Sequence, residues 1–331
     1  NCLNLTTITL PTAGSASGVD FSYAFYNCTA LTTLTNLENF TNVTNFNSAF
    51  QNCLNLTTIT LPTAGSASGL SFPYAFLNCT ALTTLTNLEK FTNVTSFSGA
   101  FYNCTSLTSI RLGSSLSSGV SQSDIFTALN PNCLIYLKDD EIATDFPSLN
   151  YIDSSTNTAL GAITLTDGKP YHCPVPFQMG SNTITYKGRT WTLAQLDEET
   201  GKGTGWNALT LPFDGQLYVG DGDNATVIPF FTSDDDLAGR YWLKRFAGTT
   251  EGSDSQTTIA RFAHQQATEE GEGDIAHTIR ANIPYIIALP GSTFGNDYSL
   301  QGQTITIRAT GITVPATPDV IADAAITDAT Y

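Results

Sequence analysis

Residues 1–51 read NCLNLTTITLPTAGSASGVDFSYAFYNCTALTTLTNLENFTNVTNFNSAFQ, and residues 52–102 read NCLNLTTITLPTAGSASGLSFPYAFLNCTALTTLTNLEKFTNVTSFSGAFY. The two segments differ at 9 of 51 positions and are identical at the other 42. A tandem repeat of this length is typical of a solenoid, in which each coil packs on the next. Solenoids usually bind partners across an extended surface, so the repeat favours a binding protein.

Each 51-residue repeat is built from two similar halves of 26 and 25 residues, and each half opens with Asn-Cys. The pattern Leu-x-x-Ile-x-Leu, as in Leu56, Ile59 and Leu61, predicts a short strand with one buried face. Because such a strand cannot bury that face alone, we expect the coils to stack into one continuous core. Four phenylalanines recur in the same phase and are predicted to form a spine in this core: Phe25, Phe50, Phe76 and Phe101.

The motif Ala24-Phe25-x-Asn27-Cys28-x-x-Leu31-Thr32-x-Leu34 resembles the BspA-like leucine-rich repeat of bacterial surface proteins, common in Bacteroides and its relatives. The alternate coils, with Phe40-Thr41-Asn42-Val43-Thr44 before Ala49-Phe50, are similar to a sister repeat in which Asn-Val-Thr recurs. The resemblance covers about residues 1–150. It implies a cell-surface or extracellular solenoid, often linked to adhesion, with a lipid or wall anchor in a segment outside this sequence.

The third repeat decays after Cys104, and Asn132-Cys133-Leu134-Ile135-Tyr136-Leu137 is followed by the charged stretch 138–141. A terminal coil needs a polar outer face, so we expect this segment to cap a solenoid that spans residues 1–152. The sequence starts at Asn1-Cys2, in mid-phase, which would leave an open sheet edge. We therefore expect further coils or a cap upstream.

From residue 153 onward the period disappears, and apolar or β-branched runs alternate with Gly, Asp and Pro turns. After a polar joint at 153–157 we predict a second domain at 153–331, an antiparallel β-sandwich-like domain with no helix beyond 193–199. The fold class is thus mainly β, a leucine-rich-repeat solenoid followed by this domain. The ten predicted strands are 162–166, 171–178, 183–187, 189–193, 206–213, 226–231, 240–247, 257–263, 285–289 and 304–309.

Phrases in the second domain also resemble a β domain often found after such repeats in Bacteroides surface proteins. They are Gly168 to Tyr171, Gly205 to Phe213 and Ala281 to Ile287. The resemblance implies no chemistry that can be carried over to particular residues.

Acidic residues outnumber basic ones by 29 to 13, and the formal net charge is −16. Residues 1–152 hold 8 acidic and 3 basic side chains, which leaves 21 and 10 for residues 153–331. Nucleic acid and anionic membranes are therefore poor partners for either part. No apolar run reaches 18 residues, so nothing in this sequence is expected to span a membrane.

Five of the seven cysteines recur once per coil, at Cys2, Cys28, Cys53, Cys79 and Cys104. Their spacing of 25–26 residues matches no zinc motif, and an in-register row of thiols pairs poorly into disulfides. We expect buried free thiols that act as small apolar side chains, ahead of a disulfide or a metal site.

The search for catalytic groups gives no positive sign, and we expect no enzyme and no cofactor. The three histidines, His172, His264 and His277, lack the motifs of a nucleophile and its base, and no phosphate-binding loop occurs. Paired carboxylates for glycoside hydrolysis stay open, although the acidic runs read better as solvated turns. Asp221, Asp223 and Asn224 form a weak calcium candidate, with a plain Asp-Gly turn as the alternative.

The favoured function is therefore non-enzymatic binding at the cell surface, with a host extracellular protein or a glycan as the partner. The alternatives are a structural spacer that projects other modules and a glycan-binding β domain, where Trp191, Trp206 and Trp242 could stack on sugars or, more simply, pack the core. The solenoid would present outward-facing threonines, which can also be read as good strand formers on a solvated sheet. The candidate binding residues are Thr7, Thr9, Thr33, Thr35, Thr58, Thr60, Thr84 and Thr86.

Overall fold

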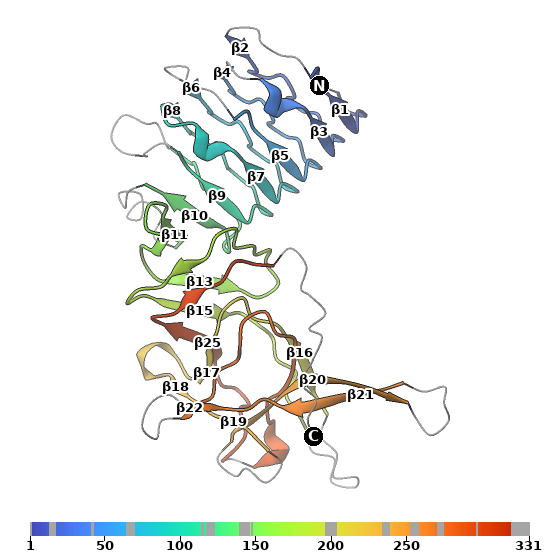
Figure 1. Ribbon diagram of the computed structural model, residues 1–331, viewed down its shortest axis with the longest axis vertical. Helices are drawn as coiled ribbons and strands as arrows, with labels where there is room; N and C mark the ends of the chain where they lie inside the picture. The colour runs from blue at the N-terminus through green and yellow to red at the C-terminus, as the bar shows by residue number, and fades with distance from the viewer. Residues whose placement is uncertain are drawn as a thin grey trace. The chain divides into compact units, whose positions relative to one another are not determined.

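The computed structural model (Figure 1) divides the chain into two compact units, Asn1–Asn182 and Thr183–Tyr331. Strands dominate both units, and the helical segments among the described residues are short 3-10 turns. The structure describes residues 2–12, 18–40, 43–63, 70–113, 116, 123–138, 146, 148–195, 204–233, 239–251, 258–269, 275–295 and 297–318.

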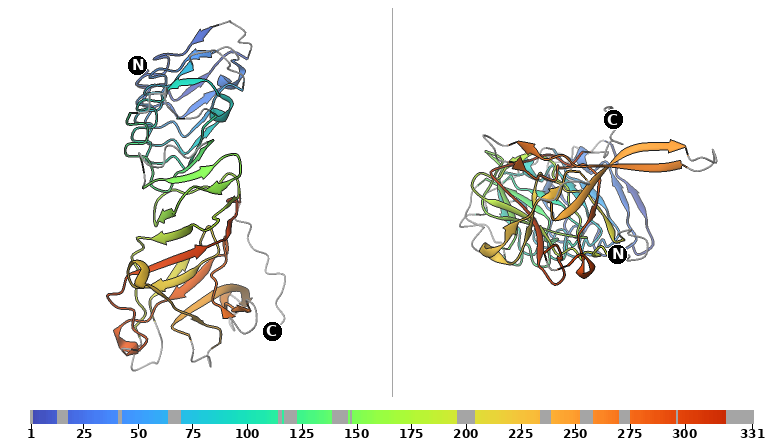
Figure 2. Two further views of the ribbon diagram at one scale, coloured as in Figure 1. Left: turned by 90° about the vertical axis from the view of Figure 1, so that its left-hand side faces the viewer. Right: turned by 90° about the horizontal axis from the view of Figure 1, so that it is seen from below.

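The first unit opens with a β-solenoid of about six coils, which confirms the predicted architecture for the repeats. Its coils stack one on the next in both views (Figures 1 and 2). The first strand of each coil forms one series: β1 (Thr7–Thr9), β3 (Thr33–Thr35), β5 (Thr58–Thr60), β7 (Thr84–Thr86), β9 (Ser109–Arg111) and β10 (Leu134–Leu137). These strands pair in parallel as β1 with β3, β5 with β7 and β9 with β10.

A second series of strands forms another wall of the solenoid, a parallel sheet in the order β2-β4-β6-β8. In alternate coils a 3-10 turn, η1 (Leu37–Asn39) or η2 (Leu88–Lys90), connects the two strand positions. The bounds of this second series are Val19–Asp20 for β2, Val43–Asn45 for β4, Leu70–Ser71 for β6 and Val94–Ser96 for β8.

The core of the solenoid contains two columns of stacked phenylalanine rings. The predicted spine is confirmed and extends to Phe126, with neighbouring ring centroids 5.2 to 6.0 Å apart. The sequence analysis missed a second column with spacings of 4.9 to 5.8 Å, formed by Phe21, Phe46, Phe72 and Phe97. Leu56, Ile59 and Leu61 are buried beside these columns, as their spacing predicted.

The Asn-Cys pairs are explained by two ladders that link the coils. Asn27, Asn52, Asn78 and Asn103 all have left-handed backbones, with φ between 55° and 63°, a conformation that Asn tolerates better than most residues. The Nδ2 of Asn52 donates to the Oδ1 of Asn27 at 2.6 Å, and the Nδ2 of Asn78 donates to Asn52 at 2.8 Å. Each asparagine thus fixes a turn and ties it to the preceding coil.

The thiols of the same pairs point inward. The Sγ of Cys53 donates to the carbonyl oxygen of Phe25 at 3.1 Å, and Cys79 and Cys104 repeat this contact with Phe50 and Phe76. All these thiols are free and buried, as predicted, whereas Cys2 at the first coil is exposed.

The segment expected to cap the solenoid contains the strand β10, and residues 139–141 of its charged stretch lie outside the described residues. All four residues of β10 are buried, so this strand has no polar outer face. It pairs in parallel with β9 on one side and with β11 (Asn150–Asp153) on the other. The antiparallel strand β12 (Thr158–Ala159) follows β11 and pairs in parallel with β14 (Phe177–Gln178). The parallel series thus continues for one strand more than the sequence suggested.

Residues 153–182 belong to the first unit, whereas the sequence analysis placed them in the second domain. Buried asparagines hold this segment, which includes β13 (Ile163–Thr166), against the last coils. The Nδ2 of Asn132 donates to the carbonyl oxygens of Thr166 and Lys169, and its Oδ1 accepts from the Thr166 amide at 2.7 Å. Asn150 binds Thr164 in the same two-way manner. Such side-chain contacts leave no periodic sign in the sequence, and the expected joint lies inside the unit.

The second unit contains two main sheets. The first is antiparallel, in the order β15-β25-β17-β18. The second has the order β16-β24-β20-β19, with β21 also paired to β20. In it β19 pairs in parallel with β20, so the expected purely antiparallel arrangement fails there.

The strands of the first sheet are β15 (Thr183–Lys187), β17 (Gln216–Val219), β18 (Thr226–Val227) and β25 (Ile305–Thr310). Those of the second sheet are β16 (Trp206–Leu209), β19 (Phe230–Phe231), β20 (Tyr241–Glu251), β21 (Thr258–His264) and β24 (Tyr285–Ala288).

Shorter elements complete the second unit: β22 (Thr268–Glu269) paired with β23 (Ile275–Ala276), β26 (Thr313–Val314), and the 3-10 turns η4 (Gly222–Asn224) and η5 (Ser292–Phe294). Of the predicted strands, 189–193 is not a strand, and residues 193–195 are not helical, while 196–199 lie outside the described residues. The strand β17 was missed. The long hairpin β20–β21 projects from the rest of its unit (Figures 1 and 2).

We expect Leu56→Ala to destabilise the solenoid by about 2–5 kcal/mol, because it opens a cavity between coils. Thr58→Ala removes an exposed side chain and is expected to change the stability by less than about 0.5 kcal/mol. The stability of both variants is measured as the midpoint of a urea titration, in which alkylation of the buried thiols reports unfolding. Equal shifts would reject the assigned facing of this strand.

The asparagine ladder can be tested at Asn52. Asn52→Ala loses the ladder hydrogen bonds and places a Cβ in a left-handed backbone, whereas Asn52→Gly loses the hydrogen bonds alone. We expect the alanine variant to unfold more easily than the glycine variant by about 1 kcal/mol in urea titrations. A glycine variant that is the less stable of the two would contradict the backbone argument.

Candidate functional site

The eight candidate threonines lie on one exposed series of strands. In each three-residue strand the two threonines are exposed and the residue between them turns inward, as in Thr58-Ile59-Thr60. Thr7 lies beside Thr33 and Thr9 beside Thr35, and β5 and β7 repeat this register. The array is therefore regular in geometry, and its use for binding stays a prediction.

Neighbouring coils are linked by hydroxyl contacts within and beside this array. The Oγ1 of Thr35 donates to the Oγ1 of Thr9 at 3.3 Å, and the Oγ1 of Thr32 donates to the carbonyl oxygen of Thr6 at 3.0 Å. Thr83 repeats the second contact with Thr57 at 3.1 Å. The surface thus offers an uncharged grid of hydroxyls whose positions are fixed by the strands beneath them.

The calcium candidate lies in the loop of the β17–β18 hairpin. Asp221, Asp223 and Asn224 are all exposed, and the 3-10 turn η4 forms around Gly222, whose φ is +54°. The Asn224 amide donates to the Asp221 carbonyl oxygen at 3.2 Å, and the Gly222 carbonyl oxygen accepts from Arg308 at 3.0 Å. The arrangement is a backbone turn, and whether it binds calcium stays untested. Within the described ranges, no three His, Cys, Asp or Glu side chains gather as a metal site would require.

The buried thiols are poor nucleophiles. Burial raises the pKa of the Cys53 and Cys104 thiols to about 12, and it raises the pKa of Cys79 well above the usual 9.0. Burial also raises the pKa of Cys173, whose Sγ lies 3.0 Å from the Val175 carbonyl oxygen. Because the thiolate is the reactive form, these cysteines are held in their inert state.

The carboxylate of Asp214 connects two segments of the second unit. The Asp214 carboxylate accepts from the Arg280 guanidinium at 2.7 Å and from the Ala281 amide at 2.7 Å. It ties the segment after Phe213 to the segment before β24. The acidic run 234–236 lies outside the described residues, and whether any carboxylate pair is catalytic stays untested.

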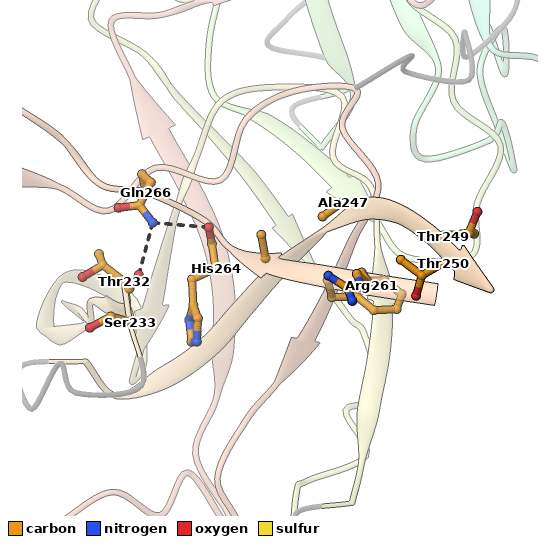
Figure 3. Close-up of a pocket in the computed structure, with 10 residues that line it drawn as sticks. Thr232, Ser233, Ala247, Thr249, Thr250, Arg261, His264 and Gln266 are labelled. Atoms are coloured by element: carbon orange, nitrogen blue, oxygen red, sulfur yellow. Dashed lines mark hydrogen bonds between the residues drawn. The ribbon is translucent and has the colours of Figure 1, made fainter. Parts of the chain in front are cut away.

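A hollow of about 770 Å³ lies along the β20–β21 hairpin, and sequence reasoning missed it. Figure 3 shows Thr232, Ser233, His264 and Gln266 at one end and the other labelled residues along the strands. The described lining contains one arginine, one histidine, hydroxyls and an amide, and no carboxylate. Its residues are Thr232, Ser233, Ala247, Thr249, Thr250, Arg261, Phe262, Ala263, His264 and Gln266.

Two contacts fix the end of this hollow. The Nδ1 of His264 lies 3.1 Å from the Phe231 carbonyl oxygen, and since a carbonyl only accepts, the proton of this contact resides on Nδ1. The Nε2 of Gln266 donates to the Thr232 carbonyl oxygen at 3.2 Å. The hollow can therefore receive hydrogen-bonding groups. It could not be predicted from the sequence, because His264, Arg261 and the hydroxyl side chains that line it follow no regular spacing.

The three tryptophans do not form a buried core. Trp206 is 42% exposed, and Trp191 and Trp242 are half-buried. Trp242 stacks on Phe231 at 5.1 Å, and the Lys244 ammonium lies 5.9 Å from the centre of the Trp206 ring. The simpler expectation that all three pack the core is wrong, because the sheet carries Trp206 and Trp242 on the face opposite the buried Leu209 and Leu243.

Residues 1–128 match the family model described as BspA type leucine rich repeat region, in six copies. The resemblance noted from the sequence is confirmed for this stretch. Repeats of this family are often found in surface or secreted proteins, and they are typically non-enzymatic interaction scaffolds. No curated protein and no solved structure matches the chain. The described residues include no helix with the length and apolar character needed to cross a bilayer.

The buried thiols predict a pH dependence. A folded pKa near 12 for Cys53 and Cys104 means that, above about pH 9, the unfolded chain loses thiol protons that the folded chain keeps. The stability is unaffected by these thiols below their usual pKa and falls as the pH rises from about 9 to 12, by up to about 1.4 kcal/mol per pH unit for each thiol.

The check compares urea midpoints of the parent and of Cys53→Ala/Cys104→Ala between pH 7.5 and 10.5 under reducing conditions. The variant has a lower midpoint throughout but a shallower decline. Parallel declines would show that these thiols do not set the pH dependence.

Proposed function

We propose that this chain is a non-enzymatic binding protein of the cell surface or extracellular space. Its solenoid would present the threonine face, Thr7, Thr9, Thr33, Thr35, Thr58, Thr60, Thr84 and Thr86, to a host extracellular protein or a glycan. The observation that carries the proposal is the register of exposed threonines on successive strands over a rigid stacked core.

The chemistry of the face limits the kind of partner. Hydroxyls on a flat sheet give many modest hydrogen bonds and little charge, which suits an extended surface more than a compact charged ligand. The family match supports the same class of function, since repeats of this type are typically interaction scaffolds. Adhesion to a host partner is the finer form of this proposal.

The same proposal includes the second unit, which we take to be a sandwich-like domain distinct from the solenoid. Its two main sheets and its own buried core, with Phe213, Phe230 and Tyr241, support an independent domain. A glycan-binding role for this unit is the second candidate function, favoured by the exposed ring of Trp206 and by the hollow along the hairpin. A spacer role is what remains if neither unit binds.

The test probes the full chain on an array of extracellular matrix proteins and glycans. The variant Thr7→Lys/Thr60→Lys places two long charged side chains on the threonine face, at positions two strands apart. The matched control Thr210→Lys/Thr226→Lys adds the same charge at exposed positions of the second unit. We expect the first variant to lose about tenfold or more of its binding to at least one array ligand and the control to retain it.

Three results would change the conclusion. If every array ligand of the parent still binds Thr7→Lys/Thr60→Lys, the threonine face is rejected. Binding to glycans that Trp206→Ala abolishes would transfer the function to the second unit. An array with no signal for the full chain would favour the spacer.

A further inference from the structure

A row of tyrosines lies on the turns between the second strand of one coil and the first strand of the next. It consists of Tyr23, Tyr26, Tyr74 and Tyr102, and we refer to it as the tyrosine row. Tyr23, Tyr74 and Tyr102 are 57%, 46% and 37% exposed, which is unusual for such large rings beside a well-packed core. No hydroxyl of the row has a hydrogen-bond partner among the described residues. The rings are thus presented to solvent.

Two members of the row occupy a backbone conformation that disfavours them. Equivalent turn positions of the successive coils have φ between 52° and 58°, and their occupants are Tyr23, Ser48, Tyr74, Gly99 and Asp124. Their amides donate to the next coil, as Tyr23 does to Asn47 at 2.9 Å and Tyr74 to Ser98 at 2.8 Å, so the conformation is imposed. Left-handed backbone is rare for bulky residues and clusters at functional sites. Stability would favour the glycine that Gly99 supplies.

The neighbouring coil makes room for the ring. A Cβ added to Gly99 would lie 2.6 Å from Cδ1 of Tyr74, so the ring of Tyr74 rests directly on the glycine backbone. At the corresponding place beside Tyr23, the next coil carries the small residue Ser48. Large and small residues therefore alternate along the turns, and the tyrosine rings recur every second coil.

The spacing of the rings follows from the stacking of the coils. Equivalent phenylalanines in consecutive coils are 5.2 and 5.6 Å apart, so equivalent positions two coils apart, such as Tyr23 and Tyr74, are separated by about 11 Å. A pair of linked pyranose rings in an extended polysaccharide has about this length. Tyr26 is packed against Tyr23 at 5.8 Å, and Tyr102 lies on the coil after Tyr74, at the turn position that Tyr26 occupies in its own coil.

The turns that carry the row hold no charged side chain, while Asp20 precedes the first turn and Asp124 occupies the equivalent position in the coil after Gly99. The four turns at 21–31, 46–55, 72–81 and 97–106 contain no Asp, Glu, Lys or Arg, although the chain carries 42 such residues, 29 acidic and 13 basic. The amides of Asn27, Asn52, Asn78 and Asn103 run beside the rings and are part-buried in their ladder. A nucleic acid needs positive charge and is a poor match. Aromatic faces beside amides and hydroxyls match the apolar faces and hydroxyl groups of sugars.

We propose that the tyrosine row is a second binding surface of the solenoid, which takes an extended, uncharged polysaccharide by stacking its sugar rings on Tyr23 and Tyr74. The polysaccharide lies along the stack of coils, with every second sugar ring above a tyrosine. This surface is distinct from the threonine face and does not depend on it.

Affinity electrophoresis of the full chain in gels that contain an uncharged linear polysaccharide tests the proposal, with a mixed-linkage β-glucan, a mannan, a xylan and a galactan as the probes. We expect at least one probe to retard the parent. Tyr23→Gly/Tyr74→Gly removes both rings and suits the left-handed backbone, so retardation falls by about tenfold or more while the urea midpoint stays equal or rises. Tyr23→Phe/Tyr74→Phe keeps the rings and binds within about threefold of the parent.

Two controls separate this surface from others. Tyr298→Ala removes a ring of similar exposure in the second unit, and Thr7→Lys/Thr60→Lys changes the threonine face, and both retain retardation. The proposal is overturned if no probe retards the parent, if the glycine variant binds like the parent, or if the glycine variant loses stability together with binding. It is also overturned if the threonine variant alone loses retardation, or if the row binds array proteins and no polysaccharide.

Discussion

The packing of one coil on the next is the contact on which the rest of the first unit depends. A coil of 25 or 26 residues cannot enclose its own apolar side chains, so Leu56 and Phe50 are buried by the coils above and below them. The same stacking places the asparagine amides within hydrogen-bonding distance, draws the thiols to the carbonyl oxygens of the preceding coil and aligns the surface threonines. The surface threonines are regularly spaced because the buried side chains beneath them must repeat from coil to coil in order to pack.

At the Asn-Cys pairs, the residue that suits the local backbone also suits the contacts between coils. A left-handed turn favours Asn or Gly, and of these two only Asn can also pass a side-chain hydrogen bond from coil to coil. A buried position that faces a carbonyl oxygen suits a small side chain with a weak donor, which cysteine supplies. This agreement across levels is why the repeats could be recognised so readily from the sequence.

The sequence could predict what is periodic. The facing of Leu56 and Thr58, the spine that begins at Phe25 and the buried thiols follow from spacing alone, and the structure confirms them. It could not predict that Asn132 and Asn150 bind the segment 163–169, because such contacts join residues without any repeating pattern. For the same reason the hollow beside His264 and the exposed side of Trp206 were not foreseen. The threonine face was located correctly, and its role in binding stays a prediction.

The alternation of coils also limits how this protein can change in length. Tyr74 rests on Gly99 of the next coil, and the parallel strands pair as β1 with β3 and β5 with β7. An inserted single coil would place two coils of one type in contact, so that a tyrosine could meet another tyrosine and the strand pairs would lose their partners. A gain or loss of two coils together preserves every contact. The gene of such a protein can therefore grow or shrink in steps of 153 nucleotides, three for each of the 51 residues in a repeat, without a new interface having to arise.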